Sequence, residues 1–361
     1  MGTVYEADRL SIGGVVAIKV LHPDRVRDAK SVRRFHKEAR AAAAIGHPNI
    51  CEVHDLGALE DGTPYLVMER LVGETLAVRL VRERRIPFDE AADILIQVLS
   101  ALTVTHQKGI VHRDIKPENV FLSYRVGCAP LVKVLDFGIS KMITTSSGRE
   151  ETRLTHPGMV IGTIGYMSLE QACGSPDLDA RVDLYACGVI LYETLTGRRP
   201  FSATNIAELL PQLLRTNPPA ASELVSRLPA GVDAVLDRAM ARSRDDRYAT
   251  AHDMQRDLQA VRERSSAALA VAAAAAPPPG EFATEPPPAW ASPEGSSLTV
   301  PEAAPSSVDI PIEFTEATQS SETVFGVDLP DTDEDIDDQD TLVTPMDRAA
   351  LAARLPKKPE K

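Results

Sequence analysis

The sequence is poor in cysteine and aromatic residues, and it has no long apolar run. Its four cysteines form no C-x-x-C pair, which argues against a disulfide framework or a zinc site and suits reduced thiols. The longest apolar run, 267–276, is half of the roughly 20 residues that a helix needs to cross a bilayer. No signal-peptide pattern opens the chain. These absences predict a cytoplasmic protein without a membrane span.

The chain also lacks an excess of positive charge. Residues 281–361 contain 18 Asp and Glu against 5 Lys and Arg, whereas residues 1–280 contain 34 of each sign. The whole net charge of −13 therefore lies in the C-terminal segment. No basic stripe is present to bind a nucleic-acid backbone, and the acidic segment would repel one. Nucleic acid is thus excluded as a predicted partner.

Residues 1–71 are expected to form a small antiparallel β lobe with one helix. Residues 1–21 alternate and are rich in β-branched side chains, with a turn at 11–14, which predicts a hairpin. An Ala-, Lys-, Arg- and Glu-rich helix is expected over 29–45, stopped by Gly46-His47-Pro48. Two more strands are predicted at 50–56 and 65–69.

Residues 72–263 are expected to form a larger, mainly helical lobe, so the fold class is α+β. Residues 91–106 carry apolar side chains at helical spacing with almost no charge, which indicates a buried helix. Further helices are predicted at 183–195, 207–214, 232–241 and 251–263. Residues 264–361 are an Ala- and Pro-rich, then acidic segment that we predict to be disordered, because it cannot bury enough apolar surface to offset its ordering entropy.

Three motifs carry the chemistry of this chain. The run His112-Arg113-Asp114-Ile115-Lys116-Pro117-Glu118-Asn119 is followed by Asp136-Phe137-Gly138, and both are preceded by Val16-Ala17-Ile18-Lys19. Two carboxylates, an amide and lysines at these spacings are what a phosphoryl-transfer site requires. A three-residue motif alone is weak evidence, but the three motifs in this order make coincidence improbable.

Residues 2 to about 262 resemble the catalytic domain of the protein kinases, and in particular the bacterial Hanks-type serine/threonine kinases. The resemblance rests on the motifs above, on His47-Pro48-Asn49-Ile50, on Asp-Phe-Gly-Ile-Ser at 136–140 and on Tyr-Met-Ser-x-Glu-Gln at 166–171. It implies a two-lobe fold, ATP and Mg²⁺ as cofactors, and transfer of the γ-phosphate to Ser or Thr hydroxyls of protein substrates.

The resemblance assigns a role to each matching residue. Lys19 would pair with the α- and β-phosphates of ATP and be held by Glu38 of the following helix. Asp114 would be the catalytic base, and Lys116 would neutralise charge on the γ-phosphate. Asn119 and Asp136 would bind magnesium through oxygen ligands. The alternative, solvated lysines and hydrogen-bonded loop residues, is outweighed by the complete set.

Adenine recognition is implied by apolar positions around the join between the lobes. Met68 would be the gatekeeper, and Glu69 to Leu71 the hinge whose backbone pairs with the adenine edge. Val4 and Ala17 would form the roof of the nucleotide site, Phe121 its floor, and Gly2 would belong to the phosphate-covering loop. Apolar residues at these positions would belong to the core in any fold, so they carry little weight alone.

Other matching residues imply regulation and support. A buried Arg113 needs an anionic partner, which in similar kinases is a phosphorylated activation-segment residue, and Thr152 and Thr155 are the candidates at a suitable distance. Thr163 is expected to hydrogen-bond Asp114 and Lys116 rather than accept phosphate. The structural residues implied are Asp183, which would cap the catalytic-loop backbone, and the ion pair of Glu170 with Arg247.

The chain departs from the family at its start. The kinase loop G-x-G-x-x-G-x-V is represented only by Gly2 and Val4, and the first strand and two glycines are absent. One hypothesis is that Met1 is an internal methionine of a longer protein. The main alternative function is a catalytically impaired scaffold or regulator, and a small-molecule kinase is a third. The acidic tail is interpreted either as a docking or phosphoacceptor segment or as a solubilising extension.

Overall fold

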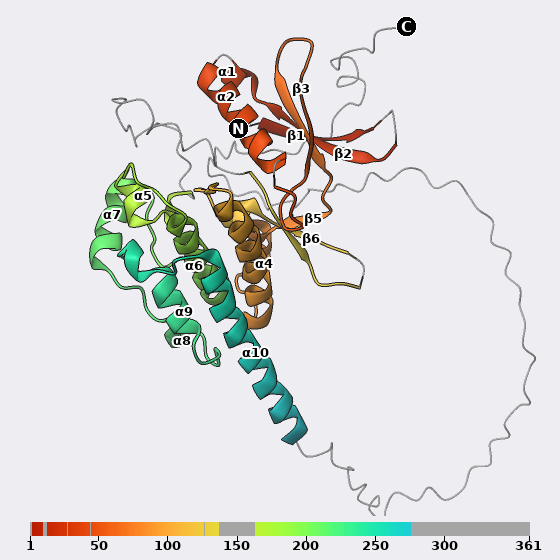
Figure 1. Cartoon of the computed structure of the whole chain (residues 1–361). Helices are drawn as coiled ribbons and strands as arrows, with labels where there is room; N and C mark the ends of the chain where they lie inside the picture. Colours follow the sequence, from red (N-terminus) through yellow and green to blue (C-terminus); the bar gives the residue numbers. More distant parts are fainter. Residues whose placement is uncertain are drawn as a thin grey trace, which may run out of the picture.

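The computed structural model has a β-sheet lobe joined to a larger helical lobe (Figure 1). It describes residues 2–9, 13–26, 28–43, 45–125, 127–136 and 163–275. The two lobes meet where strand β4 (Pro64–Glu69) ends and strand β5 (Gly73–Thr75) begins. This arrangement confirms the predicted α+β class with a small antiparallel lobe and a large helical one.

The upper lobe is a four-stranded antiparallel sheet. Its strands are β1 (Gly2–Asp8), β2 (Val15–Leu21), β3 (Val53–Ala58) and β4, in the order β1-β2-β4-β3. The predicted hairpin is present, since β1 pairs with β2 from Gly2 opposite Leu21 to Asp8 opposite Val15. Gly13 and Gly14 precede β2 with φ of +75° and +93°, which glycine adopts without steric cost.

Two helices belong to this lobe. The short α1 (Pro23–Val26) was not predicted, and it begins at a proline, whose fixed φ suits a first helical position. The longer α2 (Ala29–Ala43) matches the helix predicted over 29–45 and ends two residues earlier. It packs on β3 and β4, and Phe35 and Ala39 are buried. The apolar stripe at i and i+4 is what orients this helix against the sheet.

The strand predicted at 50–56 begins only at Val53, because the preceding backbone is used elsewhere. The Cys51 N–H donates to Val134 O at 3.1 Å, and the Val134 N–H donates to Asn49 O at 2.8 Å. Val134 belongs to a small lower sheet that was not predicted, with strands β5, β6 (Val120–Ser123) and β7 (Leu131–Val134) in that order. The segment 49–51 therefore adds to β7 and ties the two lobes together.

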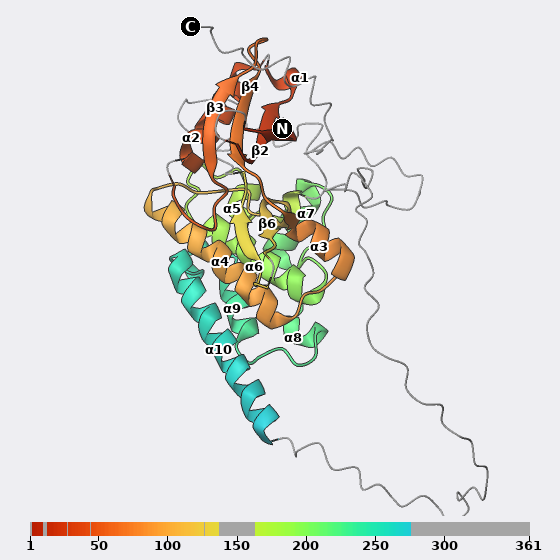
Figure 2. The ribbon, with the colours of Figure 1, turned by 90° about the vertical axis from the view of Figure 1, so that its right-hand side faces the viewer.

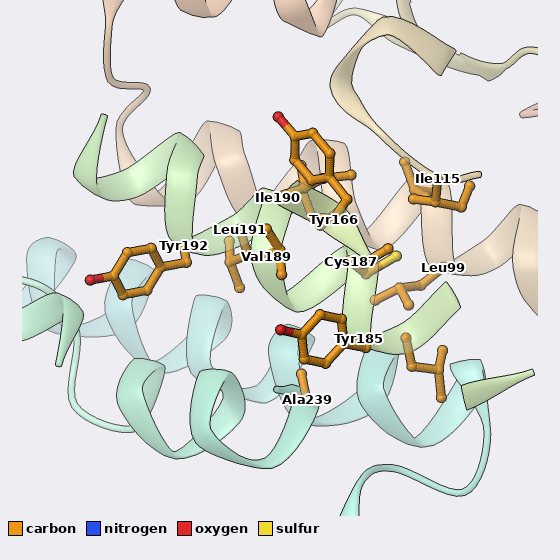
Figure 3. Close-up of a cluster of buried hydrophobic side chains, with 14 of the residues drawn as sticks. Leu99, Ile115, Tyr166, Tyr185, Cys187, Val189, Ile190, Leu191, Tyr192 and Ala239 are labelled. Carbon is orange, nitrogen blue, oxygen red and sulfur yellow. The ribbon is translucent and has the colours of Figure 1, made fainter. Parts of the chain in front are cut away.

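The lower lobe is organised around α6 (Arg181–Thr196). Thirteen of its sixteen residues are buried, because it is apolar on every face. Figure 3 shows part of this core, in which Tyr185, Cys187 and Val189 lie near Leu99 and Ala239 of neighbouring helices. The other helices are α3 (Leu76–Glu83), α4 (Phe88–Gln107), α5 (Leu169–Ala172), α7 (Ile206–Arg215), α8 (Ala221–Leu224), α9 (Val232–Ala239) and α10 (Ala251–Ala275).

Helix α10 packs along α4 and then projects beyond the lobe (Figures 1 and 2). The Arg262 guanidinium contacts the Asp93 carboxylate at 2.5 Å across this contact. Because α10 continues to Ala275, the tail predicted to start at 264 begins inside a helix, and that boundary is corrected. Residues 276–361 lie outside the described part of the chain. None of the described helices is long and apolar enough to cross a membrane.

Candidate active site

Lys19 reaches the interface between the lobes from the middle of β2. It lies opposite Val4 of β1 on one side and Leu66 of β4 on the other, and its side chain is only 6% exposed. Its Nζ atom is 2.5 Å from Asp136 Oδ2. A buried ammonium is costly without an anion, so this ion pair explains how a lysine is tolerated in an apolar strand. It joins residues 117 positions apart.

Asp136 follows β7 in a left-handed backbone conformation, with φ of 43°. Burial alone would raise the pKa of its carboxyl group, but the charge and hydrogen bond of Lys19 outweigh that effect and hold the pKa below its usual value. The charge of Asp114 acts in the opposite direction, which places the two carboxylates within electrostatic reach of each other. Asp136 is therefore held in its ionised form. The rest of its motif, residues 137 and 138, lies outside the described residues.

The loop that carries Asp114 is fixed by one buried carboxylate, that of Asp183 in the first turn of α6. Asp183 is 1% exposed, and it accepts the backbone N–H of His112 at 2.8 Å and that of Arg113 at 2.7 Å. Its Oδ2 atom is also 2.8 Å from His106 Nε2. These bonds stabilise the left-handed conformation of Arg113, whose φ is 65°.

His112 completes this support from inside the loop, where it is fully buried. The Asp114 N–H points to His112 Nδ1 at 3.3 Å, so Nδ1 acts as an acceptor. The other ring nitrogen, Nε2, then carries the proton and donates to Leu135 O at 3.0 Å. The neutral imidazole thus connects the backbone of Asp114 to the residue that precedes Asp136.

Asn119 and Lys116 lie beside Asp114. The Asn119 amide nitrogen donates to Asp114 O at 2.7 Å, which leaves its side-chain oxygen as the remaining acceptor. Asn119 O in turn accepts the Leu135 N–H at 2.9 Å, so Asn119 and Asp136 sit on adjoining backbone segments. Lys116 Nζ is 3.9 Å from Asp114 Oδ2. Three of the predicted catalytic residues, Lys19, Asp114 and Lys116, are thereby gathered at one place with the predicted magnesium ligands Asn119 and Asp136.

The donor set at this place fits a divalent cation bound mainly by substrate oxygens. No cluster of three or more His, Cys, Asp or Glu that could hold a metal occurs among the residues that the structure describes. Magnesium does not need one, because it uses one or two protein oxygens and completes its octahedron with phosphate and water. The Asp136 carboxylate and the Asn119 amide oxygen are hard ligands of that type.

The residues predicted to bind adenine lie in strands β1, β2, β4 and β6 and in the hinge after β4. Ala17 lies opposite Met68 across the β2–β4 pair, and Val4 lies in the neighbouring strand β1. Phe121 is buried in β6, next to Gly73, which follows the hinge segment containing Leu71. Gly2 is buried at the edge of the sheet, where a Cβ would fall 2.3 Å from Val20 O. Only glycine fits this close approach.

Sequence reasoning missed Lys133 of β7. Its Nζ atom is 2.5 Å from Glu69 Oε1 at the hinge and 3.5 Å from Ile50 O. The same Glu69 oxygen accepts the Glu52 N–H at 2.8 Å. The only signal in the sequence was a lysine inside an apolar strand, which indicates a buried cation but not its partner.

The predicted regulatory residues are described only in part. The Arg113 guanidinium is half-buried and donates to Leu178 O at 3.3 Å, while its buried Nε has no hydrogen-bond partner among the described residues. Burial lowers the pKa of this group, against the opposing charge of Asp183. Thr152 and Thr155 lie outside the described residues, as do the side chains of Thr163 and of Glu38 in α2. The predicted roles of these four remain predictions.

The structure brings Glu170 and Arg247 together as a bidentate ion pair, with oxygen–nitrogen distances of 2.6 and 3.0 Å. The Arg247 side chain is completely buried, and it lies over the Tyr185 ring at 4.9 Å. Burial by itself would raise the pKa of Glu170, but the hydrogen bond and charge of Arg247 dominate and lower it. The pair links α5 to the turn before α10, away from the reacting groups.

Comparison with known proteins agrees with this geometry. The model of the protein kinase domain matches residues 1–258. Serine/threonine-protein kinase Pkn1 of Myxococcus xanthus is 42% identical over 262 residues, covering 72% of this chain and 36% of the relative. PrkC of Bacillus subtilis is 36% identical, with coverage of 72% and 38%. The crystal structure of the Mycobacterium tuberculosis PknI kinase domain has a TM-score of 0.55 at 28% identity, covering 72% of this chain and 91% of that one.

A β lobe over a helical lobe, with Lys19, Asp114, Asn119 and Asp136 meeting between them, is the architecture of a phosphotransferase domain. The chain belongs to the protein kinase family and resembles its bacterial serine/threonine members. ATP and divalent metal use are general in that family. The chain spans about a third to a half of the length of the curated relatives named first among its matches.

Proposed function

We propose that this protein transfers the γ-phosphoryl group of ATP to serine and threonine hydroxyls of proteins. The observation that carries the proposal is the convergence on Asp136. Lys19 contacts its carboxylate at 2.5 Å, Asp114 lies within electrostatic reach, and Asn119 is bonded to the adjoining backbone. A lysine, two carboxylates and an amide in this arrangement can bind a metal-bound triphosphate and receive a proton.

The chemistry assigns one task to each side chain. The acceptor hydroxyl oxygen attacks the γ-phosphorus, the bond to the β-phosphate oxygen breaks, and ADP leaves. Asp114 accepts the hydroxyl proton at a carboxylate oxygen and orients the nucleophile, while Lys116 neutralises charge on the transferred group. When bound, Mg²⁺ supplies charge neutralisation on the phosphate oxygens, and Asp136 and Asn119 would hold it. Lys19 would pair with the α- and β-phosphates.

We further propose that Arg113 responds to phosphorylation of Thr152 or Thr155. Arg113 is half-buried beside the catalytic loop, and its Nε lacks a partner within the described part of the chain. A phosphate would supply acceptor oxygens for this guanidinium. Because the four cysteines are free thiols and ATP is a cytosolic substrate, we place the reaction in the cytoplasm.

The test is incorporation of γ-labelled phosphate from ATP and Mg²⁺ into the full chain and into casein. We expect label on Ser and Thr, abolished by Asp136→Ala and reduced by at least about a thousandfold in Asp114→Asn. Asp245→Asn is the matched control, because Asp245 is an exposed carboxylate of the lower lobe. Absence of label in the parent protein would favour the scaffold function instead. Loss of activation in a Thr152→Ala/Thr155→Ala variant tests the regulatory proposal.

A further inference from the structure

Four arginines from two distant segments form a basic surface on the lower lobe. Arg84 and Arg85 follow α3, and Arg198 and Arg199 follow α6. The segments are adjacent, because a Cβ on Gly197 would lie 2.8 Å from Arg84 O and 2.9 Å from Arg85 Cγ. We call these four residues the arginine surface.

Arg199 of this surface lies 4.0 Å from the Glu193 carboxylate, whereas the positive charge of the other three arginines is not balanced by an ion pair in the part of the chain that the structure describes. The side chains of Arg84, Arg85 and Arg198 are exposed, and none has an ion-pair partner within the described residues. Arg82 of α3, by contrast, pairs with Glu74 of β5 and with Glu83 of α3. The lobes as a whole carry equal numbers of acidic and basic residues, so three uncompensated arginines are a local excess.

Arg84 occupies a backbone conformation that arginine adopts at a cost. Its φ is 58°, and its N–H closes α3 by donating to Leu80 O at 2.8 Å. Glycine adopts such a positive φ at the end of a helix without steric cost. A positive φ is strained for any residue with a Cβ, and Arg227 on another part of the lobe shares it.

We propose that the acidic segment Asp328–Asp340 of this same chain docks on the arginine surface. Eight of these 13 residues are Asp or Glu, and none is Lys or Arg. The segment is the densest run of negative charge in the chain and lies outside the described residues. Acidic side chains on exposed guanidiniums form charge-assisted, often bidentate hydrogen bonds.

The stretch of chain between the end of α10 and the acidic segment is long enough for the segment to reach the arginine surface. Fifty-two residues, 276–327, separate Ala275 at the end of α10 from Asp328. Fully extended they reach at most about 170–190 Å, and coil statistics give a mean span of roughly 40 Å. Tethering over such a span corresponds to an effective concentration on the order of 1 mM, so weak contacts are sufficient for occupancy.

The surface extends toward the loop that precedes α5. Arg199 Nη1 would lie 2.5 Å from a Cβ placed on Gly165, in the turn Thr163–Tyr166. A segment bound along the four arginines would therefore end beside this turn. This inference concerns only where the tail binds, and it holds whether or not the proposed phosphotransfer is correct.

Carbodiimide cross-linking of the full chain tests the proposal, because it joins a carboxylate to an amine only at contact distance. The variants are Arg85→Lys and Arg198→Lys, which keep the charge and introduce an amine. Arg227→Lys is the matched control, since Arg227 is also exposed and has a positive φ of 69° but lies in another part of the lobe. Mixing ¹⁴N- and ¹⁵N-labelled protein separates links within a chain from links between chains.

We expect links from positions 85 and 198 to residues 328–340 of the same chain, roughly tenfold more frequent than from position 227. They should disappear in about 0.5 M NaCl, where the screening length falls to a few ångströms. Equal linking at position 227, or no linking to 328–340, overturns the proposal. Links found only between differently labelled chains would assign the surface to a second copy instead.

Discussion

Removal of the Glu170 carboxylate should strongly destabilise the lower lobe. The substitution Glu170→Ala leaves the guanidinium of Arg247, whose side chain is completely buried, without its anion. Breaking a buried ion pair in this way costs about 3–5 kcal/mol. Three backbone carbonyls, those of Ala241, Arg242 and Arg181, still accept from Arg247 at 2.7 to 3.4 Å. Because these carbonyls still stabilise the guanidinium, we expect the loss of unfolding free energy to lie near the lower end of this range of about 3–5 kcal/mol, at about 3 kcal/mol.

Two further variants define the size of this effect. Glu170→Gln keeps one oxygen acceptor and loses the charge, so we expect a loss of about 1–2 kcal/mol. Asp245→Asn removes a carboxylate that is 80% exposed and pairs with Arg181, for which about 0–1 kcal/mol is expected. Urea unfolding followed by circular dichroism at pH 7 measures all three. The reasoning is refuted if Glu170→Ala costs no more than Asp245→Asn.

The same pair predicts a pH dependence of stability. The folded-state pKa of Glu170 lies below its ordinary value of 4.5, so the unfolded state binds a proton first as the pH falls. The stabilisation is then fully present above pH 4.5 and is lost as the pH falls through the lower, folded-state pKa. The difference in unfolding free energy between the parent protein and Glu170→Gln should be constant from pH 7 to about pH 5 and narrow below pH 4.5. A constant difference down to pH 3 would contradict this.

Three other outcomes follow from the described contacts. Asp183→Asn replaces one oxygen that accepts the His112 or Arg113 N–H by an amide donor. We expect kcat to fall about 10–100-fold, as steady-state kinetics can measure. The free energy of unfolding should fall by about 1–3 kcal/mol, as urea unfolding can measure. Lys133→Met removes the ion pair with Glu69 at the hinge, so KM for ATP should rise severalfold with little change in kcat. Lys133→Arg should restore the KM of the parent protein. An unchanged KM in Lys133→Met argues against a positioning role. Burial raises the pKa of Cys51 to about 12 and that of Cys187 well above its usual value. Iodoacetamide at pH 8 should therefore label only the exposed Cys128 and Cys173 in the folded protein, which mass spectrometry can verify.

Local patterns in the sequence were sufficient for the elements that their own residues determine. The β1–β2 hairpin follows from β-branched alternation and two glycines at the turn, and α6 follows from its continuous apolar stretch. The short α1 and the strands β5 to β7 were missed, because each is only three or four residues long and depends on neighbours for its hydrogen bonds. The continuation of α10 to Ala275 was missed because an Ala-rich stretch suits a helix and a linker equally.

The residues of the candidate site were also predicted from the sequence alone, since Lys19, Asp114, Asn119 and Asp136 fall in recognisable local motifs. Only the tertiary structure decided which groups touch. It paired Lys19 with Asp136, placed Lys133 on Glu69, and used Asp183 to hold the backbone of His112 and Arg113. The physical reason is that spacing along the chain fixes the distance between neighbours in one helix or strand. The distance between residues 64 to 117 positions apart depends on how whole elements pack.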